Sequence, residues 1–163
     1  MSSAVSQPRH HLEIIDGRES EKPLPKKLHV FIQTYLIVAL SRELPRRYRV
    51  ASELNVLCGS DRLVPDVTVM MRDAKFIEGD LADPPVFAVE ILSPGQTVGQ
   101  LFDKADRLVR AGAQVCWIIW PERRKAWLYS AQDVLEAYDF LVADLCDDET
   151  ATVPVDALWA ELD

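Results

Sequence analysis

The spacing of apolar residues predicts two helices. Between Pro25 and Leu44, apolar residues recur with the period of a helix that buries one face. The members of that face are Leu28, Phe31, Ile32, Tyr35, Leu36, Ala39 and Leu40. A second amphipathic stretch begins after Thr97, a suitable N-cap, and continues to about Ala111. Gly112 follows it and is typical of a helix C-terminus.

Alternating or continuous apolar runs predict the strands. Residues 48–56 alternate between apolar and polar, as in a half-buried strand, and residues 63–71 form a continuous β-rich run. A short loop joins these two, which favours a hairpin. Residues 86–92 and 115–120 are apolar on both faces, so with the helix between them they predict a βαβ unit with parallel strands. Residues 126–130 would add an antiparallel strand.

The order of these elements is α, β, β, β, α, β, which predicts one α/β domain with a mixed sheet flanked by helices. A chain of 163 residues, 48% hydrophobic and 27% charged, is the size and composition of one globular domain. We expect a flexible N-terminal arm at residues 1–11, a main domain at 12–140, which opens with a short strand and an Asp-Gly turn, and an acidic segment at 141–163. An edge strand and a short terminal helix should complete the chain.

The net charge of −8 is unevenly distributed. Residues 141–163 contain seven acids and no Lys or Arg, so the remaining 140 residues carry a net charge of only −1. Taken whole, the charge argues against a protein that coats nucleic acid or an anionic membrane by positive potential. The acidic segment could instead shield basic residues of the body until a substrate displaces it.

The cysteines and the apolar runs predict a cytoplasmic protein. Cys58, Cys116 and Cys146 lie far apart without a CxxC pair, which fits a reducing compartment and argues against a disulfide framework. The N-terminus lacks an apolar signal region, and the run from Val30 to Leu40 is too short to span a bilayer. We therefore expect neither secretion nor membrane insertion.

Glu90 is the strongest candidate for chemistry. It is the one charged residue in a strand that is otherwise apolar on both faces. A buried carboxylate needs a cation, hydrogen bonds or a shifted pKa. If the strand lay at a sheet edge, Glu90 would simply face water. The buried alternative is the better one because both faces of the strand are apolar.

Asp66 and Lys104 are the other candidates. Asp66 follows Pro65 at the start of a strand, where an aspartate can be only a turn residue. If its strand neighbours that of Glu90, the two carboxylates would supply hard oxygen ligands for Mg²⁺ or Mn²⁺. Lys104 flanks the apolar stripe of the second helix and could extend its ammonium to Glu90, although a helical lysine is more often solvated.

The segments LVPDVTVM, PPVFAVEILSP and FDKADRLVRAGAQVCWIIWPE carry a family resemblance. Together they resemble the bacterial Uma family of endonucleases, a branch of the PD-(D/E)xK restriction-endonuclease-like superfamily. The resemblance covers residues 12–129, and the predicted αβββαβ order is similar to the core of that superfamily.

The resemblance implies a Mg²⁺-dependent (or Mn²⁺-dependent) endonuclease acting on DNA. Asp66 and Glu90 would bind the metal, with the backbone carbonyl of Ile91 as a further ligand. Lys104 would position the attacking water or offset charge on the phosphate. Glu21, after the Asp-Gly turn, matches a glutamate that approaches the site and could add a further metal ligand, or it is an exposed turn acid. The bound ion would polarise the scissile phosphate and offset the charge that develops on it.

Some positions depart from the family pattern. The lysine of the ExK motif is replaced by Leu92, and Leu108, Cys116 and Trp120 replace residues usual in the family. These changes favour an alternative, a catalytically inactive nuclease-fold module acting in protein–protein interaction or oligomerisation. A nearly neutral body also suggests that a homodimer, formed through aromatics such as Trp127, would be needed to hold DNA.

Overall fold

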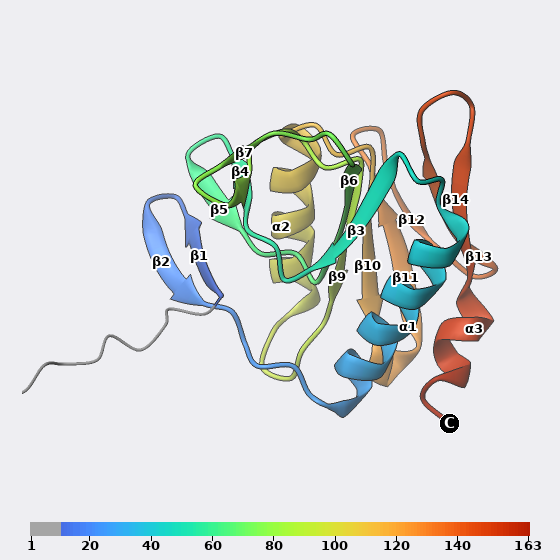
Figure 1. Cartoon of the computed structure of the whole chain (residues 1–163). Coiled ribbons are helices and arrows are strands. Elements are labelled where there is room, and N and C mark those ends of the chain that lie inside the picture. Colours follow the sequence, from blue (N-terminus) through green and yellow to red (C-terminus); the bar gives the residue numbers. More distant parts are fainter. Residues whose placement is uncertain (1–10) are drawn as a thin grey trace, which may run out of the picture.

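The computed structural model describes residues 11–163, so nearly all of the predicted N-terminal arm lies outside the described residues. A six-stranded mixed sheet forms the centre, in the order β12-β11-β10-β9-β6-β3 (Figure 1). Its strands, in chain order, are β3 (Tyr48–Ser52), β6 (Val67–Met71), β9 (Phe87–Ile91), β10 (Cys116–Trp120), β11 (Lys125–Tyr129) and β12 (Val134–Glu136). Within this sheet β9 and β10 pair in parallel, and the other pairs are antiparallel.

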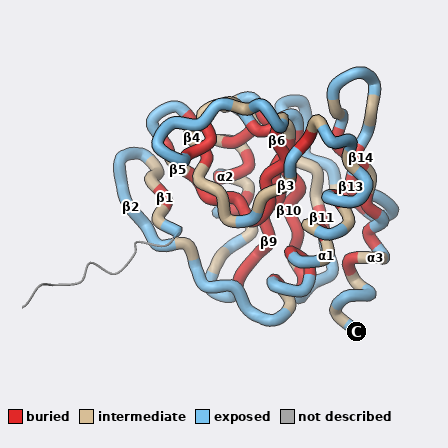
Figure 2. Tube along the Cα trace, in the orientation of Figure 1, coloured by how far each residue is buried: buried red, intermediate tan, exposed pale blue. Residues whose placement is uncertain are grey.

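Helices α1 (Lys27–Glu43) and α2 (Val98–Arg110) cover opposite faces of this sheet (Figure 1). Each face has its own core: Ile32 packs with Trp117 on the α1 side, and Leu101 packs with Ile118 on the α2 side. Figure 2 shows the resulting belt of buried chain through β9 and β10. The α/β class, the mixed sheet and the parallel pair around α2 are confirmed.

The predicted strand at residues 63–71 is wrong as a single element. Val64, Pro65 and Asp66 separate β5 (Asp61–Leu63) from β6, because proline lacks the amide that a central ladder needs. β3 and β6 do pair antiparallel, as the predicted hairpin requires, but β4 (Val56–Cys58) and β5 form a second hairpin between them.

That second hairpin belongs to a second sheet, in the order β2-β1-β5-β4-β8-β7. Its remaining strands are β1 (Leu12–Ile15), β2 (Arg18–Glu21), β7 (Phe76–Ile77) and β8 (Asp80–Leu81). β1 and β2 form a hairpin that projects beside α2 (Figure 1). The predicted short strand and Asp-Gly turn are the first half of this hairpin.

The apolar face predicted for α1 is partly wrong. Phe31, expected in the core, is 43% exposed, whereas His29 and Gln33 are buried beside Ile32. His29 and Gln33 are one helical turn apart and therefore share a face. The sheet-facing side of α1 thus carries two polar groups near its N-terminus, and both serve the site described below.

The acidic C-terminal segment packs on the body of the protein. It forms the hairpin β13 (Phe140–Asp144) and β14 (Thr150–Pro154), followed by α3 (Val155–Ala160). Leu141, Val153 and Leu158 are fully or almost fully buried in the α1-side core. The boundary at residue 140 stays a prediction, but much of the segment after it belongs to the folded core.

This segment also pairs with basic residues of the body. Arg47 contacts Glu149 at 2.5 Å, and Arg124, which follows a 3₁₀ turn at Pro121–Arg123, pairs with Asp163.

All three cysteines are free thiols. Across residues 11–163, no helix has the length and apolar character needed to cross a membrane.

Candidate active site

The register of two central strands brings Asp66 and Glu90 together. β6 and β9 pair antiparallel, with Val67 opposite Val89. Continuing this register by one residue places Asp66 opposite Glu90. Side chains that face each other across neighbouring strands lie about 5 Å apart at their Cβ atoms. Both residues are almost completely buried, at 0% and 2% exposure, so the alternative of a water-facing Glu90 is wrong.

Helix α2 delivers Lys104 to Glu90. A capping box formed by Thr97 and Gln100 fixes the start of the helix. Lys104 lies three residues after Leu101, on the flank of the buried stripe, and is only 4% exposed. Its Nζ lies 3.0 Å from Glu90 Oε1 and 2.7 Å from an oxygen of Glu13. The expected approach of the ammonium to Glu90 is therefore present, and a solvated Lys104 is excluded.

Asp66 is held by groups from three segments. Its Oδ2 accepts a 2.6 Å hydrogen bond from the amide of Ile91 on β9. Its Oδ1 faces Lys22 Nζ at 2.6 Å and His29 Nε2 at 3.1 Å. On the other side of the imidazole ring, His29 Nδ1 lies 2.9 Å from the hydroxyl of Ser93. One carboxylate oxygen is thus fixed by the backbone, and the other faces cationic or titratable groups.

Five residues of this cluster were missed by sequence reasoning. Glu13, Lys22, His29, Gln33 and Glu53 all lie around the predicted pair. Gln33 donates to Glu53 Oε1 at 2.9 Å and to the carbonyl of Asp66 at 2.8 Å. The polar residues His29 and Gln33 on a buried helix face were a usable signal. Lys22 and Glu53 lie in polar connections, where the sequence gives no such signal.

Two further predicted residues lie near this centre in different ways. Glu21 ends β2 and is exposed. It lines an open pocket of about 630 Å³ together with Glu13, Lys104 and residues at the start of α2. The next residue, Lys22, reaches the carboxylates instead. Ile91 is fixed next to Asp66 through its amide, and the role expected for its carbonyl stays a prediction.

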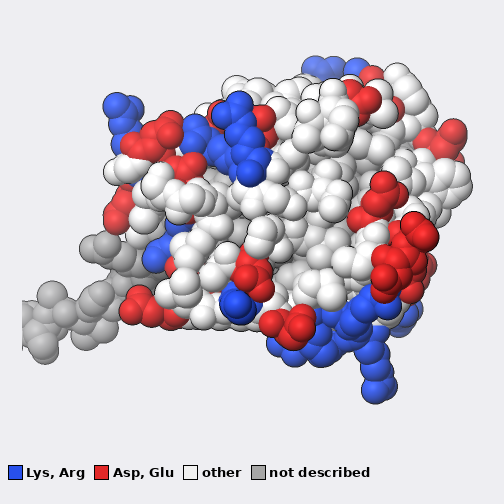
Figure 3. Space-filling view, turned by 90° about the horizontal axis from the view of Figure 1, so that it is seen from above, with Lys and Arg blue, Asp and Glu red and all other residues white. Residues whose placement is uncertain are grey.

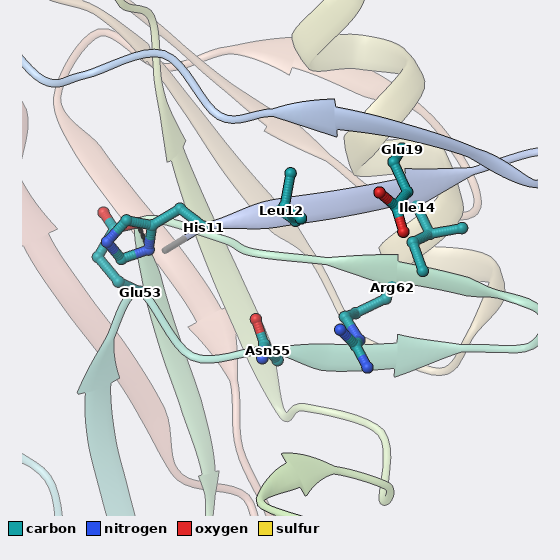
Figure 4. Close-up of a pocket in the computed structure, with 7 residues that line it drawn as sticks. All are labelled: His11, Leu12, Ile14, Glu19, Glu53, Asn55 and Arg62. Carbon is teal, nitrogen blue, oxygen red and sulfur yellow. Dashed lines mark ion pairs between the residues drawn. The ribbon is translucent and has the colours of Figure 1, made fainter. Parts of the chain in front are cut away.

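A second pocket, of about 280 Å³, opens beside Glu53. Figure 4 shows Glu53 and His11 at one end of it, with Asn55 and Arg62 along the lower side. His11 Nδ1 lies 3.6 Å from Glu53 Oε2. Glu53 has a positive φ of 52°, in the left-handed region that non-glycine residues rarely adopt. Glu53 lines this pocket, and its carboxylate also contacts Lys22 and Gln33.

Burial and charge shift the protonation equilibria of the cluster. Burial raises the pKa of Glu90 to about 7, with Asp66 adding to the rise and Lys104 opposing it. Burial also disfavours ionised Asp66, but Lys22 and His29 hold the pKa of Asp66 well below its usual range. Burial would lower the pKa of Lys104, yet Glu90 and Glu13 raise it above the usual value. Asp66 is therefore ionised and Lys104 is charged at neutral pH.

The cluster has the donor set of a divalent cation site. Among the described residues, Asp66 Oδ1 and Glu90 Oε1 are buried oxygens without a hydrogen bond of ordinary geometry, although ammonium groups lie within 3.0 Å of both. When all are ionised, the carboxylates of Glu13, Glu53, Asp66 and Glu90 carry two more charges than the ammonium groups of Lys22 and Lys104. Carboxylate oxygens suit Mg²⁺ and Mn²⁺, and a divalent cation would balance the excess. The residues present therefore fit such an ion.

The chain shares its fold with a solved structure that is described as a putative nuclease. A crystal structure described as a putative nuclease belonging to DUF820, from Anabaena variabilis ATCC 29413, matches with a TM-score of 0.80 and 25% sequence identity. The match covers 97% of this chain and 94% of that chain. The family model Uma2, described as "Putative restriction endonuclease", matches residues 2–154, and the chain belongs to this family. The family match extends past residue 129, where the recognised motifs ended.

Two other comparisons add no functional information. A search of curated proteins found no match. A cryo-EM structure of a DrdV–DNA complex is 12% identical and covers 68% of this chain and 12% of that chain. Its TM-score of 0.33 is too low to bear on fold or function.

Proposed function

We propose that this protein is a divalent-metal-dependent endonuclease that hydrolyses phosphodiester bonds in DNA. The observation that carries the proposal is the juxtaposition of Asp66 and Glu90 on neighbouring strands, with the Lys104 ammonium 3.0 Å from Glu90. Family membership and the nuclease fold support the reaction class.

The proposed ligands of Mg²⁺ or Mn²⁺ are the side chains of Asp66 and Glu90 and the carbonyl of Ile91. When bound, the ion would polarise the scissile phosphate and offset its developing charge. Lys104 is the group proposed to orient the attacking water or to stabilise phosphate charge. Its ammonium is fixed by Glu90 and Glu13 and borders the 630 Å³ pocket, through which a phosphate could approach. Glu21, on the rim of that pocket, would influence substrate rather than hold the metal.

DNA binding would depend on more than one copy of the chain. On the face seen in Figure 3, positive and negative side chains are mixed and other residues fill the middle. Two arginines that could contact phosphates are instead engaged in ion pairs: Arg47 with Glu149, and Arg107 with acids at three positions. Lys26 and Lys27 are exposed at the start of α1. We propose that a homodimer brings the exposed lysines of two copies together to hold a DNA duplex.

Nicking of supercoiled plasmid tests the proposal. We expect wild-type protein to nick in Mg²⁺ or Mn²⁺, to lose activity in EDTA, and to regain it when the metal is restored. Glu90→Ala should abolish nicking, whereas Glu43→Ala, which removes an exposed carboxylate from the end of α1, should leave it intact.

Equal nicking by wild type and Glu90→Ala would refute the assigned site. Binding of DNA or of a protein partner with no cleavage under any metal would instead favour the inactive interaction module that Leu92 suggests. Gel filtration with light scattering tests the homodimer directly, and a monomer at the concentrations that support nicking would contradict it.

A further inference from the structure

Lys22 is a buried cation to which the proposed mechanism assigns no role. It follows β2 in the polar segment that leads to α1, where a lysine would ordinarily face water. Its side chain is only 6% exposed. Its Nζ contacts Asp66 Oδ1 at 2.6 Å and Glu53 Oε2 at 2.8 Å. A lysine buried at this depth by two carboxylates is part of the site.

The groups around the Lys22 ammonium include a set that could hold a metal ion. His29, Glu53 and Asp66 each offer a ligand atom, and these atoms lie within 4.8 Å of one another. His29 Nε2 is buried and points at Asp66 Oδ1, and within the described part of the chain it has no hydrogen bond of ordinary geometry. Two carboxylates and an imidazole nitrogen around one point form a donor set for a divalent cation.

This position differs from the one proposed for the catalytic metal. The catalytic ion would use Asp66 and Glu90, on the side of the sheet that Lys104 approaches. The Lys22 position uses Asp66 with Glu53 and His29, on the side of α1. Asp66 would then be shared between two cation positions, as a bridging carboxylate is in two-metal nucleases, whose ions lie about 3.5–4 Å apart.

We propose that Lys22 is a resident second cation, whose ammonium permanently fills the His29–Glu53–Asp66 position and replaces a second metal ion. The inference rests on the proposed function for the identity of the first ion. The fixed ammonium supplies positive charge beside the phosphate without a second metal. It also confines the chain to one metal site.

The neighbouring pocket makes the position testable. The 280 Å³ pocket is lined by Glu53, one of the three ligands of this position (Figure 4), so a hydrated ion could approach from this side. Truncation of the ammonium should therefore leave a vacant, accessible set of ligands. Lys22→Met keeps the aliphatic stem and removes the charge. Lys26→Met is the matched control, because Lys26 lies four residues away, is exposed, and makes no side-chain cap to α1.

Binding of Mn²⁺ to the protein without DNA, followed by the EPR signal of free Mn²⁺, gives the stoichiometry. We expect one ion per chain for wild type, Lys22→Arg and Lys26→Met, and two for Lys22→Met. Adding Glu53→Gln to Lys22→Met should return the stoichiometry to one. An unchanged stoichiometry in folded Lys22→Met would overturn the inference.

A measurement on the wild type covers the case in which Lys22→Met does not fold. In ¹⁵N-lysine-labelled protein, the Lys22 ammonium signal, assigned with Lys22→Arg, should persist when Mg²⁺ saturates the protein. Its loss on Mg²⁺ addition would show that the metal displaces Lys22, which contradicts a resident cation. A third outcome separates the two proposals. If wild type bound no Mn²⁺ but Lys22→Met bound one ion, and adding Glu53→Gln removed that ion, only the proposed function would be refuted. If neither protein bound an ion, both proposals would fail.

Discussion

Replacing Lys104 by methionine should destabilise the fold as well as abolish nicking. The Lys104 ammonium is the direct partner of Glu90 and Glu13, both at least 95% buried. Removing one partner of a buried ion pair costs about 3–5 kcal/mol, because the remaining charge is left unpaired. Glu13 keeps a hydrogen bond from the amide of Val64 at 3.0 Å. We therefore expect a loss of about 3 kcal/mol, at the lower end of this range.

The loss should depend on pH with a defined sign. Glu90 has a pKa of about 7 with Lys104 present, and Lys104 lowers it. Without the ammonium, the pKa of Glu90 in the folded variant rises further above its value in the unfolded chain. Between those two values the folded state binds more protons, so the free energy of unfolding falls as pH rises. The variant should be closer to wild type at about pH 5.5 than at about pH 8.

Urea denaturation followed by tryptophan fluorescence measures the effect. Lys125→Met is the control, since Lys125 is about half exposed and lies 3.8 Å from Glu136, and we expect a change below about 1 kcal/mol. The double variant Lys104→Met/Glu90→Gln should recover about 1–3 kcal/mol without recovering nicking. A loss below about 1 kcal/mol for Lys104→Met would refute the buried pair.

Two further stability predictions test the packing around the site. Leu158→Ala, in the terminal helix, should lower the free energy of unfolding by about 2–5 kcal/mol because Leu158 is fully buried. Leu135→Ala, at a 53% exposed position, is the control. Equal losses of stability in the two variants would contradict core packing by the acidic segment. Gly112→Ala should cost more than about 1 kcal/mol, since Gly112 has φ of +119° and its Cβ would lie 2.8 Å from Pro84 Cβ. Thermal unfolding should show no comparable loss for Gly99→Ala, whose added Cβ would lie 3.9 Å from Thr97 Oγ1, an ordinary contact distance.

The elements with long, regular apolar patterns were predictable. The strands β9 and β10 are continuous apolar runs, and α2 between them has a complete amphipathic face with a cap at each end, so their parallel arrangement followed from known topology rules. The second sheet was mostly missed because β4, β5, β7 and β8 are only two or three residues long. Periodicity carries little information over so few positions.

The residues of the candidate site also divide into those that the sequence predicted and those that it did not. Glu90 and Lys104 stood out because each is a charge that interrupts an apolar pattern. His29 and Gln33 interrupt the pattern of α1 too, but the apolar residues beside them, including the exposed Phe31, suggested a different buried face. Lys22 lies in a polar segment where charge is ordinary, and only the chain path from β2 to α1 directs it inward.

Helix α2 positions more of the site than Lys104 alone. Arg107, one turn further along the helix, makes a bidentate contact with Asp16 in the β1–β2 turn, with both distances 3.0 Å. It also reaches Asp61, the first residue of β5, at 2.7 Å. The hairpin that carries Glu13 is thereby tied to the helix that carries Lys104. Because bidentate arginine–carboxylate contacts restrict orientation as well as distance, docking of α2 on the sheet and placement of the hairpin are coupled, and both fix the charges around Asp66 and Glu90.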